Sequence, residues 1–97
     1  MQVTITKSTN AGKKYMAQIG EKTVHFGASG YGDFTTHKDE KRKASYLARH
    51  KPTEDWTLTG IHTAGFWARW LLWNQPSINA SIQDINARFK SLKVTTR

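Results

Sequence analysis

The chain has 97 residues and no Cys, which leaves room for one domain, residues 1–97, and excludes disulfides and thiolate zinc sites. No apolar run approaches the roughly 20 residues of a membrane span, and the first ten residues contain no apolar signal-peptide core. We therefore expect a protein that works inside a cell without a membrane partner. Hydrophobic residues make up only 37% of the chain, but four Trp, four Phe and three Tyr can form a core.

The first part of the chain has the pattern of short β-strands. Apolar and polar residues alternate in three runs within residues 2–26, and a Gly-containing turn separates successive runs. A small antiparallel meander is the simplest arrangement of three such strands. Residues 27–35 contain three Gly and show no clear period, so we expect a loop that carries two aromatic residues, Tyr31 and Phe34.

A basic helix follows the loop. Thr36 is the expected N-cap, with Asp39 three residues later in a variant of the capping box. The helix should run to about His50 and end before Pro52, which cannot continue it.

The next helix, over about residues 63–73, is apolar on nearly every face. Such a helix is usually buried, although its aromatic side chains could instead stack on unpaired bases. In so short a chain we favour the core role. Arg69 is unusual on this helix, and it could pair with Glu54 or Asp55, stack on a Trp, or face a ligand.

A third helix begins after Ser77 and shows the clearest amphipathic stripe in the chain. The stripe consists of Ile78, Ile82, Ile85, Phe89 and Leu92. We expect Ile82, Ile85 and Phe89 to pack against the Trp-rich helix and the strand layer. The predicted fold class is α+β, with a small N-terminal antiparallel β-meander followed by three helices.

The net charge of +8 is concentrated in two segments. Residues 37–51 hold six basic and two acidic residues, and residues 88–97 hold four basic and no acidic residues. The rest of the chain is neutral overall. This distribution favours a surface that attracts anions over a uniformly solvated one, and we expect the two segments to form one continuous positive surface.

Within the first basic segment, Lys38, Arg42, Ser45 and Arg49 fall on one helical stripe with Lys41 beside it, and Ala44 and Leu47 lie on the other side. Such a helix would dock by its apolar face and present cations that bind phosphate. The alternative is a solvated helix face without a ligand. The candidate nucleic-acid-binding residues are Lys38, Lys41, Arg42, Lys43, Arg49, Lys51, Arg88, Lys90, Lys93 and Arg97.

Other kinds of site have weaker support. The four His show neither an HxxxH nor an HExxH spacing, so we expect no metal and no cofactor. A nuclease could use Asp33, Asp39, Glu40 and Lys41, but Asp39 and Glu40 are adjacent in a helical first turn, where capping explains them. The run GASGYG lacks the Lys of a P-loop and the GxGxxG spacing. We therefore expect a protein that is not an enzyme.

One resemblance covers roughly residues 13–90. The stretches VHFG, GYGDFTTHKDEKRKASYLARH, EDW and TAGFWARWLLWN, followed by PSI and the last amphipathic helix, resemble an uncharacterised family of small basic proteins of large double-stranded DNA viruses. The resemblance implies a viral origin and a location in the virion or in the interior of the host cell. It implies no reaction and no catalytic residues.

Two functions from different classes fit these observations. The first is non-catalytic binding of nucleic acid, with DNA favoured, through phosphate contacts that are mainly independent of sequence. The second is a minor structural protein of the virus particle, whose basic faces bind acidic surfaces of a viral capsid protein.

Overall fold

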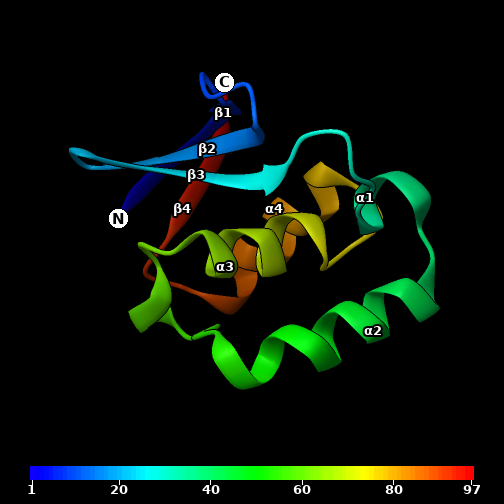
Figure 1. Cartoon of the computed structure of the whole chain (residues 1–97). Helices are drawn as coiled ribbons and strands as arrows, with labels where there is room; N and C mark the ends of the chain where they lie inside the picture. Colours follow the sequence, from blue (N-terminus) through cyan, green and yellow to red (C-terminus); the bar gives the residue numbers. More distant parts are fainter.

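A four-stranded sheet forms one layer of the protein, and the computed structural model, which describes residues 1–97, places helices over one of its faces (Figure 1). The strands are β1 (Gln2–Lys7), β2 (Lys13–Ile19), β3 (Lys22–Ala28) and β4 (Lys93–Thr96), in the order β3-β2-β1-β4. The antiparallel meander β1–β2–β3 is confirmed. β4 pairs with β1 in parallel and was not predicted.

The alternation in the strands sorts the side chains between the two faces of the sheet. Ile5 lies opposite Ala17, and Ala17 lies opposite Val24, so these three side chains point to the same face. All three are buried, and they join the main hydrophobic core. The other face presents mainly Thr, Gln and Met side chains to solvent.

The helices differ in their boundaries from the prediction. They are α1 (Phe34–His37), α2 (Glu40–His50), α3 (Ala64–Trp67) and α4 (Ile78–Arg88), with short 3-10 turns at Lys51–Thr53 and Leu58–Gly60. α3 continues directly into a π-helical segment, η3 (Ala68–Leu72). The α+β class, with an N-terminal meander followed by helices, is confirmed, but the structure has four α-helices where three helices were predicted, and β4 follows them.

The predicted first helix is two helices, because Asp33 and Asp39 each cap one. Asp33 and Thr36 form a capping box at the start of α1, so Thr36 is the third residue of α1 and not the N-cap of the long helix. Lys38 then adopts a left-handed conformation with φ 56°, which ends α1. The Asp39 carboxylate accepts the backbone N–H groups of Lys41 and Arg42 and starts α2.

The α3–η3 helix lies between the sheet and the other helices. Phe66 and Trp67 are fully buried, and the Trp67 ring lies 6.4 Å from the ring of Phe26 on β3. The Trp67 indole N–H donates to the Ile61 carbonyl oxygen, so its polar atom is satisfied inside the core. The expected core role of this helix is confirmed.

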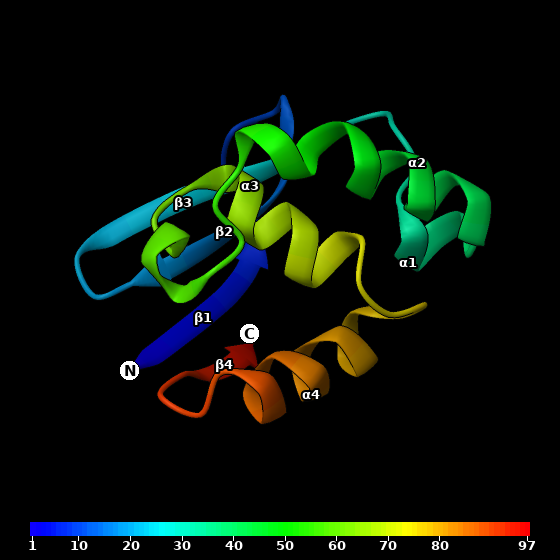
Figure 2. The ribbon, with the colours of Figure 1, turned by 90° about the horizontal axis from the view of Figure 1, so that it is seen from below.

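α2 and α4 lie on opposite sides of the α3–η3 helix (Figure 2). α4 contributes the buried Ile85, and Phe89 at its end contacts the rings of Phe66 and Trp70. On α2 the packed face consists of Lys43, Tyr46, Leu47 and His50. The expectation that Ala44 belongs to that face is wrong, because the Ala44 side chain is exposed.

The amphipathic stripe does not predict the structure of the chain after Arg88. The stripe predicts a helix as far as Leu92, but α4 ends at Arg88 and the chain turns into β4. Leu92 is still buried, so its apolar character fits both outcomes. Asn86 holds the free edge of β4, because its side-chain amide donates to the Val94 carbonyl oxygen and accepts the Val94 N–H.

We predict that Asn86→Ala lowers the free energy of unfolding by about 1–2 kcal/mol, because it leaves both backbone groups of Val94 without their partner. Asn79→Ala is the matched control, since Asn79 is exposed on the same helix and makes no side-chain hydrogen bond. Urea denaturation of the two variants measures the difference. Equal stability of the two variants would contradict this account of β4.

Candidate functional site

A pocket of about 850 Å³ opens between α2 and the rest of the fold. The end of the β2–β3 hairpin, the loop before α1, α1 itself and η3 supply its other walls. The lining residues are Lys14, Gly27, Ala28, Tyr31, Gly32, Asp33, His37, Lys41, Arg42, Ser45, Tyr46, Arg49, His50, Ala68, Leu72 and Trp73. The pocket therefore joins segments that are far apart in the sequence.

The wall formed by α2 is positively charged. Lys41, Arg42 and Arg49 are exposed, line the pocket, and belong to none of the three ion pairs of the structure. Of the predicted stripe, Arg42, Ser45 and Arg49 share one face of α2, whereas Lys38 lies before this helix, at the end of α1. The Arg49 Nε–H donates to the Ser45 carbonyl oxygen at 3.3 Å, which holds the guanidinium along the helix.

The opposite wall holds the one carboxylate of the pocket. The Asp33 side chain is buried and accepts from the Lys14 ammonium at 2.6 Å and from the Thr35 N–H at 2.9 Å. Because these donors occupy the carboxylate and Lys14 neutralises it, Asp33 does not offset the charges of Lys41, Arg42 and Arg49. The pocket thus has an excess of three positive charges.

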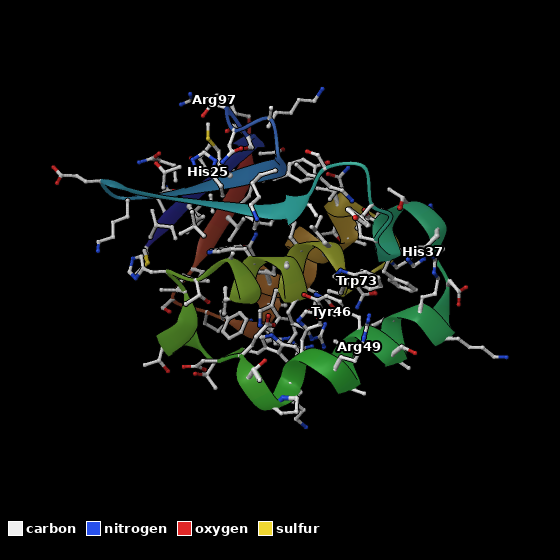
Figure 3. All side chains as sticks on the ribbon, in the orientation of Figure 1. His25, His37, Tyr46, Arg49, Trp73 and Arg97 are labelled. Atoms are coloured by element: carbon white, nitrogen blue, oxygen red, sulfur yellow. The ribbon has the colours of Figure 1, made fainter.

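Stacked aromatic rings form the floor. The Tyr46 ring stacks on the Trp73 ring, with 4.4 Å between ring centroids and 6° between planes. It also stacks on the His50 ring, with 4.2 Å between ring centroids and 24° between planes. Figure 3 shows Tyr46 and Arg49 reaching from α2 toward Trp73. Burial raises the pKa of Tyr46, and the nearby Glu54 carboxylate raises it further. Tyr46 is therefore a neutral phenol at pH 7 and adds no negative charge to the pocket.

His37 forms the side of the pocket next to Trp73, at 5.3 Å between ring centroids. Its Nδ1 accepts the backbone N–H of Asp39, so a neutral ring carries its proton on Nε2. Nε2 is buried and has no hydrogen-bond partner. The His37 imidazole therefore contacts both the residue that caps α2, Asp39, and the Trp73 ring in the floor of the pocket.

Tyr31 stands at the rim and is 74% exposed, the most exposed of the large hydrophobic side chains. It lies between Gly30, with φ 85°, and Gly32, and its ring has no stacking partner. The sequence predicts this loop and its two aromatic residues, and the structure separates them. Phe34 is buried under α2, whereas Tyr31 is free to contact a ligand.

Three further candidate cations lie in the α2 segment, and they differ in accessibility. Lys38 and Lys51 are exposed at the two ends of α2. Lys43 is half-buried, donates to the Asn74 carbonyl oxygen at 2.6 Å, and lies 4.7 Å from the centre of the Phe34 ring. Lys43 is a predicted phosphate contact, but in the structure its ammonium group is already bonded and joins α2 to the chain after η3.

The C-terminal candidates do not extend this surface. Figure 2 shows α4 and β4 on the side of α3 away from α2, and Figure 3 shows Arg97 at the end of the sheet, far from Arg49. Lys90, Lys93 and Arg97 are exposed there. Arg88 pairs with Asp84 at 3.2 Å and lies 4.5 Å from the centre of the Trp70 ring. The expectation of one continuous positive surface is therefore wrong.

Arg69 has a structural role. Its guanidinium lies 4.2 Å from the centre of the Trp70 ring and 5.4 Å from that of Trp56, and it donates to the Trp73 carbonyl oxygen. Burial lowers the pKa of Arg69, and the charge of Arg88 lowers it further. Of the alternatives open at the sequence level, stacking on Trp is confirmed, and Arg69 does not line the pocket.

Asp84, near Arg69, accepts hydrogen bonds from the side chains of Asn74 and Arg88. Burial raises the pKa of its carboxyl, but the hydrogen bonds from Asn74 and Arg88 outweigh burial and lower it below its usual value.

No group of three or more His, Asp or Glu side chains is placed to share a metal ion. No helix combines the length and the hydrophobicity needed to cross a membrane.

Comparison with known proteins gives one match. Residues 3–50, from β1 to the end of α2, match a family of unknown function, DUF5754. No curated protein and no solved structure matches the chain. The match covers the hairpin, the Tyr31 loop and the basic helix, and it assigns no activity to them.

We predict that Lys43→Met lowers the free energy of unfolding by about 1.5–3 kcal/mol, because it removes a charged hydrogen bond to Asn74 and a cation–π contact. Lys41→Met removes the same charge two residues earlier in α2, where the side chain is exposed, and should change stability by less than about 0.5 kcal/mol. Thermal and urea denaturation check both values. A larger loss for Lys41→Met than for Lys43→Met would contradict the assignment.

Proposed function

We propose that the protein is a non-catalytic nucleic-acid-binding module that holds phosphates with the exposed face of α2. The observation that supports this most is the unpaired charge on the wall of the pocket. Lys41, Arg42 and Arg49 face one cavity, and the sole carboxylate there is already neutralised by Lys14.

The types of side chain on α2 suit a phosphate backbone. Arg can bind an oxyanion through two parallel N–H donors, and Lys adds a point charge. Lys38 precedes α2 and Lys51 follows it, and both are exposed outside the lining of the pocket. A chain of phosphates could therefore follow α2 and contact about five cations.

The chemistry of the pocket supports binding more than a reaction. Its polar groups are cations, two imidazoles, hydroxyls and one carboxylate. Asp33 accepts from Lys14 and twice from Thr35, so its oxygens already have donors and it is poorly placed to act as a base. Contacts to phosphate alone do not distinguish sequences, so the binding that we propose is independent of sequence.

The test compares two double variants with the same change in charge. Arg42→Gln with Arg49→Gln removes two cations from the pocket, and Lys90→Gln with Arg97→Gln removes two exposed cations from the far side. The parent should bind a fluorescent DNA duplex with log K falling against log salt at a slope of about −4.5, as for about five phosphate contacts. In the pocket variant the slope of log K against log salt should become less negative by about two units. The far-side variant should keep the slope of the parent.

Anisotropy titrations with the duplex and with a single strand at several salt concentrations provide these slopes. Weak binding by the parent that does not depend on salt would reject the proposal. Equal losses in the two double variants would show that the net charge, and not the α2 face, determines the affinity. In either case an acidic protein surface, such as that of a capsid protein, would be the next ligand to test.

A further inference from the structure

We infer that the pocket receives one unpaired nucleotide of a single strand, with its base against Tyr31 and its phosphate on Arg42 and Arg49. This inference rests on the proposed function and deepens it, because it assigns a preference for single strands. A positive helix face alone explains contacts to phosphate. It does not explain a pocket of this volume with an exposed aromatic ring beside that face.

The size of the pocket fits a ligand of this class. Its volume, about 850 Å³, is within the range of pockets that enclose small molecules, so it can admit a base with its sugar and phosphate. A base within a duplex is stacked and paired, and it would have to leave the helix before it could enter. Entry therefore favours a strand whose bases are already unpaired.

The distribution of the side chains matches the two ends of a nucleotide. Tyr31 at the rim offers a ring face, and Ala68, Leu72 and Trp73 offer apolar surface inside. Arg42 and Arg49 stand along the α2 wall, where a phosphate attached to the bound base would lie. Aromatic stacking beside a cationic groove is the arrangement by which proteins bind single strands without reading their sequence.

The glycines around Tyr31 are consistent with this role. Gly30 has φ 85°, and the position that a Cβ atom would take at this residue has no heavy atom within 4 Å, so the loop is open on that side. Gly32 is packed instead, because a Cβ atom there would lie 3.2 Å from the His37 ring, so the loop is open on the Gly30 side of Tyr31 only. The ring has no stacking contact in the free protein that it would have to break.

The first experiment compares a single-stranded oligonucleotide with the duplex of the same sequence at one salt concentration. We expect the parent to bind the single strand more tightly. Tyr31→Ala should weaken binding of the single strand by about fivefold or more, as for the loss of one stacked base, and should leave duplex binding unchanged. Tyr31→Phe keeps the ring and should bind like the parent, and Tyr31 is too exposed for either change to affect folding.

A second pair of variants tests the cavity itself. Ser45→Leu places an apolar side chain in the pocket between Arg42 and Arg49, and Ala48→Leu places the same side chain on the same helix outside it. We expect Ser45→Leu to weaken binding of the single strand and Ala48→Leu to leave it unchanged. A free nucleoside monophosphate should bind more weakly than the strand, because it cannot reach Lys38 and Lys51.

The failure of this inference can be distinguished from the failure of the proposed function. Salt-dependent binding of both nucleic acids with equal affinity, unchanged in Tyr31→Ala and Ser45→Leu, would overturn the nucleotide pocket and leave the α2 face as a phosphate-binding surface. A monophosphate that binds as tightly as the strand would overturn the assignment to a strand. No binding of either nucleic acid by the parent would reject both proposals.

Discussion

The stacking of Tyr46 on Trp73 determines where the basic helix lies, and the candidate site depends on that position. Trp73 follows η3, which is part of the core, and Tyr46 is the buried residue of α2. The hydrogen bond from Lys43 to Asn74 fastens α2 to the same stretch of chain. These contacts leave Arg42 and Arg49 on the free side of α2, facing the Tyr31 loop across the pocket.

Local patterns predicted the strands and helices of this fold better than its long-range pairing. Alternation in residues 2–26 indicated the meander because one face of that sheet is buried and the other is not. β4 was missed because Lys93–Thr96 has only one buried side chain, and its partner strand lies at the other end of the sequence. The division between α1 and α2 depends on Lys38, whose left-handed conformation has no signal in a non-glycine residue.

The sequence predicted the part of the candidate site that depends on spacing within one helix, and it missed the contacts between distant parts of the chain. The stripe of Arg42, Ser45 and Arg49 follows from helical spacing alone and lines the pocket. Spacing could not show that Lys43 is held by Phe34 and Asn74, since Asn74 is 31 residues away in the chain. The two basic segments, residues 37–51 and 88–97, carry the same net charge. The α3–η3 helix separates them in space (Figure 2).

The role of Tyr31 illustrates what three-dimensional arrangement adds to composition. In the sequence it is one aromatic residue in a glycine-rich loop, equivalent to Phe34 three residues later. In the structure Phe34 closes the space under α2, and Tyr31 remains at the rim of a positively charged cavity. An exposed ring beside unpaired cations is the feature on which our proposal of a nucleic-acid ligand rests.

The most direct test of the account is to map the amide chemical shifts of the ¹⁵N-labelled protein during titration with a short single-stranded oligonucleotide. We expect the changes to cluster in residues 28–33, 37–50 and 68–73, which surround the pocket. Residues 88–97 and the open face of the sheet should stay unchanged. Changes centred on residues 88–97, or no changes in the segments around the pocket, would contradict the assignment of the site.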